Sequence, residues 1–164
     1  KSFQTAAWQV DMVCEMFDAL DECQSVLKAA RVIKVLPEGF VQVGPEGADI
    51  VTDSIIVHQS SPILFPVGYA KEHSITLQGP KGDNVDLDEN GSADEVLNWV
   101  SFLKRKGYKI APDHFFYQTR MSDVPFTMGM HLEAIDQNGK VLRPATVKAI
   151  KGRLVLIGFD GWEE

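Results

Sequence analysis

Alternation of apolar and polar positions is clearest near the end of the chain. Residues 145–150 read Ala-Thr-Val-Lys-Ala-Ile, and residues 153–157 read Arg-Leu-Val-Leu-Ile. A period of two is typical of strands that place one face on a core. The pattern therefore predicts β-structure here, in a second β unit that begins near Phe126.

Short strands are also expected in the first half of the chain. β-branched residues are frequent in residues 26–35 and 40–43, and Pro-Glu-Gly at 37–39 supplies a turn between them. Residues 55–57, Ile-Ile-Val, form another predicted strand. Residues 62–69, Pro-Ile-Leu-Phe-Pro-Val-Gly-Tyr, indicate a proline-bounded apolar loop with a helical turn.

One helix is predicted between these two β-rich parts. Apolar side chains follow helical spacing from Val96 to Leu103, and the pattern continues to Lys106. Asp94 is placed to cap the helix N-terminus, whereas the basic run 104–106 and Gly107 suit the last turn and the C-cap. The preceding residues are polar and predict a linker.

The two β-rich parts resemble each other. Residues 13–36 align with residues 128–151 at a constant offset of 115, which matches Asp21 with Asp136. After one inserted residue the offset becomes 114, and Gly44 then matches Gly158. Such self-similarity indicates a repeated structural unit, and the period is too long for a solenoid. Each unit is therefore expected to be a small domain.

The composition limits the classes of function. A chain of 164 residues with 45% hydrophobic content suits one large or two small globular domains. The 23 acidic and 16 basic residues give a formal net charge of −7. This balance argues against binding of a phosphate backbone as the main role, because such binding needs a basic face. It favours a basic partner instead.

Three further features of the sequence bear on the redox compartment, on membrane insertion and on whether the chain is part of a longer protein. Cys14 and Cys23 are nine residues apart and nothing requires them to pair, which favours a reducing compartment, and they show no zinc-site spacing. The most apolar run, residues 54–70, contains histidine, glutamine and two prolines, so we expect no membrane span. The chain begins Lys1-Ser2 with no initiator methionine, and we expect it to be a piece of a longer protein.

Several motifs, in the same order, resemble the malignant brain tumor repeat family. Gly-Met-His-Leu-Glu-Ala-Ile-Asp at 129–136 is followed by Ala-Thr-Val at 145–147 and Phe-Asp-Gly-Trp at 159–162. Phe-Pro-Val-Gly-Tyr at 65–69 is similar to the segment that closes each repeat, and residues 99–115 are similar to the helical arm that precedes one. The resemblance covers nearly the whole chain.

The resemblance implies a mainly β fold of tandem small Tudor-like (SH3-like) five-stranded β-barrels with helical or extended connecting arms, each packing on a neighbouring repeat. Residues 1–80 would form a first repeat with a degenerate pocket, residues 81–94 a polar linker, and residues 95–164 the arm and the N-terminal half of a second repeat. Only about half of a small barrel fits before Glu164, so we expect the second barrel to be truncated.

The resemblance also implies a methyl-lysine cage in the second repeat. The family's aspartate, asparagine and two aromatics correspond here to Asp136, Asn138, Phe159 and Trp162. The Asp-to-Asn spacing is one residue shorter than usual in the family, and a last aromatic would lie beyond residue 164. Aromatic faces attract an alkylated ammonium, and a recessed carboxylate accepts its N–H. By spacing alone, the alternative is that the rings belong to the core and the aspartate caps a turn.

The first repeat departs from this pattern. Asp21 stands at the position of the pocket aspartate, but Cys23, Pro45 and Ala48 replace the asparagine and the two aromatics. A cation then has no aromatic face to contact. We therefore expect this repeat to act as a scaffold or as a protein-contact surface.

The implied function is that of a nuclear chromatin reader, which binds mono- and dimethylated lysine of histone tails and is linked to transcriptional repression. A different hypothesis is a ligand-free interaction scaffold that contacts other proteins of a repressor complex. A third is weak contact of the basic arm at 104–106 with nucleosomal DNA, which added salt would weaken steeply.

No catalytic, cofactor or metal site is expected. The sequence has no phosphate loop or nucleophile elbow, and its four histidines show no metal-ligand spacing. Residues 86–94 mimic a calcium loop, but Leu97 stands where the loop requires a bidentate glutamate. We interpret this stretch as a solvated acidic linker.

Overall fold

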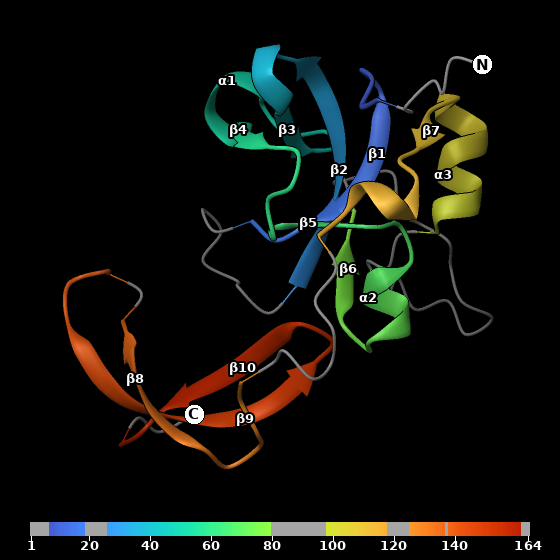
Figure 1. The fold of residues 1–164 in the computed structure, drawn as a ribbon. Helices are drawn as coiled ribbons and strands as arrows, with labels where there is room; N and C mark the ends of the chain where they lie inside the picture. Colours follow the sequence, from blue (N-terminus) through green and yellow to red (C-terminus); the bar gives the residue numbers. More distant parts are fainter. Residues whose placement is uncertain (1–6, 19–25, 80–97, 118–124, 137, 162–164) are drawn as a thin grey trace, which may run out of the picture. The chain divides into compact units, whose positions relative to one another are not determined.

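The computed structural model describes residues 7–18, 26–79, 98–117, 125–136 and 138–161. The chain forms two compact units, Lys1–Tyr117 and Gln118–Glu164 (Figure 1). Unit 1 contains a seven-stranded sheet, and unit 2 contains a separate sheet of three strands. This mainly β architecture confirms the predicted fold class.

The sheet of unit 1 follows the antiparallel order β4-β3-β2-β1-β5. Two short strands, β6 and β7, pair in parallel with β2 and β1. The strands are β1 Met12–Met16, β2 Val26–Val35, β3 Phe40–Pro45, β4 Ile55–His58, β5 Leu64–Phe65, β6 Thr76–Gln78 and β7 Lys109–Ile110. The helical elements are η1 Pro37–Gly39, α1 Ile50–Asp53, α2 Tyr69–Glu72, α3 Trp99–Lys106 and η2 Asp113–Phe115.

The turn between β2 and β3 depends on a glycine, as the Pro-Glu-Gly motif predicts. Gly39 has a φ of 81°, and Glu38 before it has a φ of 62°. A Cβ at Gly39 would lie 2.8 Å from Nε2 of His58, so a side chain there would be both strained and obstructed.

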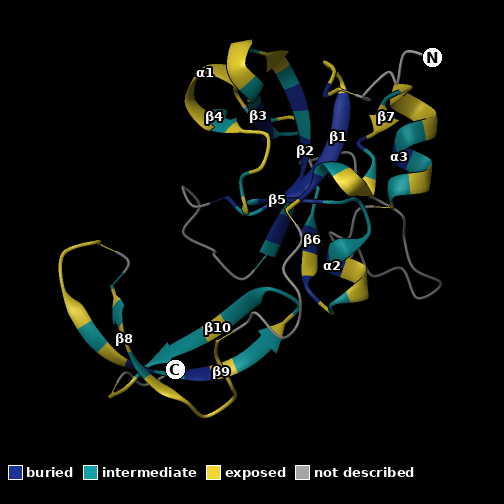
Figure 2. Ribbon diagram, in the orientation of Figure 1, coloured by how far each residue is buried: buried dark blue, intermediate teal, exposed yellow. Residues whose placement is uncertain are grey.

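The β1 strand is buried on both of its faces (Figure 2). Its inner face belongs to the core of unit 1, which also takes residues from β2, β3, β5 and the arm. The arm pairs with one edge of β1 through β7, and the Ala111 N–H that follows β7 donates to Val13 O at 3.1 Å. The core comprises Trp8, Met12, Cys14, Met16, Ala30, Val32, Val41, Val43, Leu64, Ala111 and Phe116.

The arm contains the predicted helix, and it packs within unit 1, as the resemblance implies for a neighbouring repeat. Gly107 is the C-cap with a φ of 70°, as predicted. The N-cap of the described helix is Asn98, which accepts hydrogen bonds from the Val100 and Ser101 N–H groups, and the predicted cap Asp94 lies outside the described residues. The apolar spacing extends one turn before the residue at which the cap forms, and spacing alone does not locate a cap.

Unit 2 consists of the antiparallel strands β8 His131–Ile135, β9 Leu142–Lys151 and β10 Leu154–Phe159, in the order β10-β9-β8. Ala145 and Val147 of β9 are buried, which marks one face of the sheet as the inner face. In β8, by contrast, His131, Glu133 and Ile135 are exposed on the other face.

Strand pairing confirms the internal repeat for two of the three strands. Ala30 pairs with Pro45 in unit 1, and Ala145 pairs with Phe159 in unit 2. In each unit, the pairing of the second strand with the third strand is irregular at one point. The irregularity follows Val32 in β2, and it follows the equivalent Val147, the partner of Ile157, in β9. Pro45 therefore occupies the position of Phe159, as the sequence alignment predicts.

The alignment of the first strand was wrong. Cys14 pairs with Ala30, whereas Leu132 pairs with Ala145, so Cys14 and Leu132 are equivalent. Counting four residues onward matches Asp18, and not Asp21, with Asp136. Asp21 itself lies outside the described residues. The connection after β1 is longer than the one after β8, and an alignment without a gap cannot accommodate such a loop insertion.

The backbone supports this corrected match. The Asp11 N–H donates to Val32 O at 2.9 Å, and the Gly129 N–H donates to Val147 O at the same distance. Asp11 and Gly129 both have positive φ values, 68° and 82°. The two units therefore enter their first strands in the same way.

Candidate functional site

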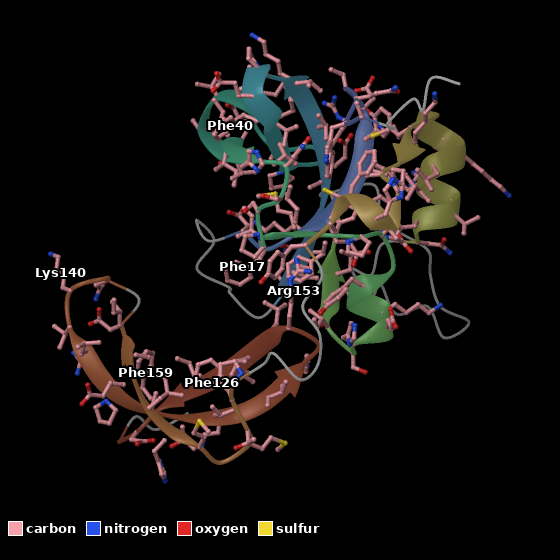
Figure 3. The ribbon with its side chains drawn as sticks, viewed as in Figure 1. Phe17, Phe40, Phe126, Lys140, Arg153 and Phe159 are labelled. Atoms are coloured by element: carbon pink, nitrogen blue, oxygen red, sulfur yellow. The ribbon has the colours of Figure 1, made fainter. Side chains whose placement is uncertain are left out.

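Three of the four predicted cage residues lie in the described part of unit 2. Asp136 directly follows β8, and Asn138 lies in the turn between β8 and β9. Phe159 ends β10 and is labelled in Figure 3. Trp162 lies outside the described residues. The roles of all four side chains in binding remain predictions.

Strand register places Asp136 and Phe159 on the same face. Phe159 pairs with Ala145, which pairs with Leu132, and side chains on paired residues share a face. Asp136 is four residues beyond Leu132 and so returns to that inner face. Phe159 is half-buried there, beside the buried Ala145.

The two side chains nevertheless lie at different heights on the sheet. At ~3.3 Å per residue, four residues amount to about 13 Å along the strand, and two strand spacings add about 10 Å across it. In a flat sheet the carboxylate and the ring would not meet. Only strong coiling of the sheet, as in a small barrel, could bring both to one recess.

The turn after β8 holds the Asp136 carboxylate in its ionised form. The Lys140 N–H donates to Oδ1 at 3.2 Å, and this contact is the largest influence that lowers the pKa of Asp136 below its ordinary value. Partial burial opposes this effect, whereas the backbone of Val141 and the side chain of Arg143 add to it. Asp136 is therefore a carboxylate at neutral pH, able to accept a hydrogen bond from a cation.

Arg143 is a neighbour of Asp136 that the sequence analysis did not single out. Its Nε lies 3.5 Å from Oδ2 of Asp136, and their side chains are 39% and 10% exposed. Arg143 pairs with Ala134 on the adjacent strand, which puts both residues on the inner face. The alternation of residues along this strand could have indicated it, because Arg143 stands two residues before Ala145 and therefore lies on the same face.

Asn138 is exposed in the turn. The turn is tight, because the Gly139 N–H donates to the Asp136 carbonyl at 2.8 Å and Gly139 has a φ of 69°. A glycine is favoured at that backbone conformation. The short spacing between Asp136 and Asn138 noted in the sequence therefore falls within a tight turn.

Unit 1 has a different arrangement at the equivalent positions. Asp18 is almost fully buried and forms an ion pair with Lys28, whose Nζ lies 2.9 Å from Oδ2. Lys28 is equivalent to Arg143: Lys28 pairs with Met16 in unit 1, and Arg143 pairs with Ala134 in unit 2. In unit 1, therefore, the Asp18 carboxylate is already paired with a cation. Pro45 stands in the position of Phe159, so β3 supplies no aromatic ring.

A second buried carboxylate in unit 1 is structural. Glu15 is fully buried and accepts hydrogen bonds from the Gly68 N–H at 2.6 Å, the Ala70 N–H at 2.7 Å and the Trp99 indole N–H at 2.9 Å. Burial raises the pKa of Glu15, and the three donors partly offset that rise. Glu15 therefore fastens α2 and α3 to the outer side of β1.

The outer face of unit 2 carries an exposed polar network. The Thr146 hydroxyl donates to Oδ1 of Asp160 at 2.8 Å and lies 3.1 Å from Nδ1 of His131. In unit 1, Arg31 and Glu46 take the places of Thr146 and Asp160 and form an ion pair at 3.0 Å. The position is thus a cross-strand contact in both units.

Other site classes receive no support from the described ranges. No group of three or more His, Cys, Asp or Glu residues in these ranges is arranged to hold a metal ion. Across the same residues, no helix has the length and apolar character needed to cross a bilayer. The calcium-like stretch at 86–94 falls outside them.

Comparison with known proteins supports the repeat organisation. The family model described as "mbt repeat" matches residues 12–84 and 130–164. The chain is 33% identical over 168 residues to human MBT domain-containing protein 1, covering 98% of this chain and 24% of that protein. It is 32% identical over 156 residues to Protein lin-61 of Caenorhabditis elegans, covering 92% of this chain and 24% of the relative. The chain therefore spans about a quarter of the length of these relatives.

A solved structure shows the same likeness in three dimensions. The four MBT repeats of Drosophila melanogaster Sfmbt, solved in complex with the peptide RHR(me)KVLR, match with a TM-score of 0.77 and 26% identity. The match covers 99% of this chain and 36% of the Sfmbt chain. Sequence, family model and fold agree, and the chain belongs to the MBT repeat family.

Proposed function

We propose that this chain is part of a chromatin reader whose second repeat binds mono- or dimethylated lysine of histone tails. Asp136, Phe159 and Trp162 would form the acid and the aromatic walls of the cage, with Asn138 supporting the carboxylate. The observation that carries the proposal is the ionised Asp136 on the same inner face as Phe159. The first repeat has Pro45 in place of that ring and a lysine on its carboxylate.

The chemistry of the side chains accounts for the expected preference. A mono- or dimethylated ammonium keeps an N–H that Asp136 can accept as a charge-assisted hydrogen bond. The aromatic faces attract its methyl-bearing cation. A trimethylated ammonium has no N–H to donate, and an unmodified one is strongly hydrated and resists transfer into the cage.

The relatives support the cellular setting. Polycomb protein Sfmbt of Drosophila melanogaster is 28% identical over 98% of this chain, and the structure of its MBT repeats contains a methyl-lysine peptide. We infer that the present protein acts in the nucleus, in transcriptional repression, alongside other proteins of a repressor complex. It would bind and not catalyse.

Asp136→Ala in the full-length protein tests the proposal. The variant should bind a dimethyllysine histone peptide roughly tenfold or more weakly than the parent, because the ammonium loses its charged acceptor. The preference for mono- and dimethyllysine over trimethyllysine should disappear as well. Calorimetric titration of one peptide in its four methylation states provides both readouts.

Asp160→Ala is the matched control. It removes one carboxylate from the same unit, but this side chain is on the outer face and contacts Thr146. We expect its affinity for the peptide to equal that of the parent. Equal binding by Asp136→Ala and the parent, with both folded, would contradict the proposal.

A ligand-free scaffold is the second candidate, and the first repeat favours it. Its carboxylate Asp18 is engaged by Lys28, and β3 supplies Pro45 where a cage needs a ring. Titration of the full-length protein against an array of methylated peptides separates the two functions. A scaffold would show no dependence on methylation at any position.

A further inference from the structure

Both units place a basic side chain on the equivalent carboxylate. In unit 1, Lys28 contacts Asp18 at 2.9 Å, and in unit 2, Arg143 contacts Asp136 at 3.5 Å. Each basic residue belongs to the second strand and stands at the same register, opposite Met16 or Ala134. The pairing is therefore a property of this strand position and not of one loop conformation.

The two ion pairs differ in how tightly they are held. The side chains of Lys28 and Asp18 are 17% and 9% exposed, so the pair in unit 1 is shielded from water on both sides. The Arg143 side chain is 39% exposed, and its distance to the carboxylate is longer. A pair with this longer contact and a partly exposed arginine is the weaker of the two, and its arginine can be exchanged for another partner.

An arginine at this place conflicts with binding of a cation. The guanidinium stays protonated at every physiological pH, and it approaches the same carboxylate that a methylated ammonium must reach. The pair of Asp136 and Arg143 is electrically neutral, so the carboxylate attracts a second cation less than an unpaired carboxylate would. An incoming ammonium must share Asp136 with the guanidinium or displace it.

We propose that Arg143 is an internal competitor of the methylated ammonium at Asp136, and that it lowers the affinity of the second repeat for its ligand. This inference rests on the proposed function of the cage. Lys28 holds the equivalent carboxylate of the first repeat permanently, whereas Arg143 holds that of the second repeat reversibly. Arg143 is therefore a specificity-determining residue: it admits only ligands whose contacts with the aromatic walls outweigh its own contact with the carboxylate.

The test uses a ligand with a single positive charge and the protein in full length. The probe is Nα-acetyl-Nε,Nε-dimethyllysine methylamide, titrated by NMR against the parent, Arg143→Gln and Arg143→Lys. We expect Arg143→Gln to bind roughly two- to fivefold more tightly than the parent, which is the range of an exposed ion pair. Arg143→Lys keeps a cation at the site and should stay close to the parent.

Arg153→Gln is the control for net charge. Arg153 lies in the turn between β9 and β10, and Figure 3 shows it at the opposite end of the unit 2 sheet from Lys140. Its removal changes the net charge by the same amount without freeing Asp136, so the affinity should equal that of the parent. Arg143→Met, which preserves most of the aliphatic stem, replaces Arg143→Gln if the latter does not fold.

Dependence on salt gives an independent readout. Between about 50 mM and about 500 mM salt, the parent should lose little affinity for the probe, because its site is neutral. Arg143→Gln leaves a net negative site, and its affinity should fall distinctly over the same range. Equal salt dependence in the two proteins would count against competition.

Each outcome of the titration decides the inference. Tighter binding by Arg143→Gln than by the parent supports competition by Arg143. If Arg143→Gln binds and the parent does not, the competition is still supported, because the arginine then closes the site. In that case only the reader function fails. Binding by the parent with equal or weaker binding by Arg143→Gln overturns the inference and leaves the reader function in place. Absence of binding by the parent and by every folded Arg143 variant overturns both.

Discussion

Glu15 offers the strongest test of how the first repeat is held together. Its carboxylate is fully buried, and three N–H donors from α2 and the arm converge on it at 2.6, 2.7 and 2.9 Å. Glu15→Gln preserves the shape of the side chain but replaces one acceptor oxygen with an NH₂ group. That group would face a donor, so at least one buried N–H loses its partner and a second donor is left unpaired beside it.

The magnitude follows from these contacts. Hydrogen bonds to a charged acceptor contribute ~1.5–3 kcal/mol each, and an unsatisfied buried donor costs ~1–3 kcal/mol. We therefore expect Glu15→Gln to lower the free energy of unfolding of unit 1 by about 2–4 kcal/mol, measured by urea denaturation. Amide hydrogen exchange should show lost protection at Gly68 and Ala70, whose N–H groups the carboxylate accepts.

Glu72→Gln is the matched control. Glu72 is exposed in α2, and its substitution should change stability by less than about 0.5 kcal/mol. The reasoning is refuted if Glu15→Gln and Glu72→Gln have the same stability and leave Gly68 and Ala70 equally protected. Such a result would mean that the carboxylate does not hold α2 and the arm on β1.

The pH dependence of stability has a definite sign at Glu15. Burial raises its pKa in the folded protein above the ordinary value of 4.5. As the pH rises above that value, the unfolded chain releases the proton before the folded protein does, so ionisation favours unfolding. The parent should lose stability from about pH 4.5 up to the folded pKa of Glu15, and Glu15→Gln should lack this contribution.

Two further predictions concern unit 1. Lys28→Met should destabilise the unit by about 1–3 kcal/mol in thermal or urea unfolding, because it removes the cation from the buried Asp18. It should not create binding of dimethyllysine, since Pro45 still replaces the ring; a methyl-dependent NMR shift in unit 1 of this variant would contradict that reasoning. Burial raises the pKa of the Cys14 thiol to about 12, and the residue is fully buried, so iodoacetamide at pH 8 should label it only after unfolding. Rapid labelling of Cys14 in the native protein, detected by mass spectrometry, would show that β1 opens readily.

The sequence determined those features that depend on local pattern. Alternation of apolar residues predicted β9 and β10, the Pro-Glu-Gly turn predicted the reversal before β3, and Gly107 marked the end of α3. The motif order identified the repeat family, and it predicted that the second repeat holds the acid and the aromatics of a cage. These features depend on residues that are close together in the sequence, so they can be predicted without knowledge of the tertiary fold.

Only the tertiary structure decided which residues face each other across strands and between distant segments. The loop after β1 shifts the first strand by three residues against the sequence alignment, so only strand pairing shows that Asp18 matches Asp136. The three donors on Glu15 come from residues 53 to 84 positions away in the chain, and no local pattern announces them. Likewise, the competition between Arg143 and a ligand follows from cross-strand register, because a charge acts through space on whatever carboxylate the fold brings beside it.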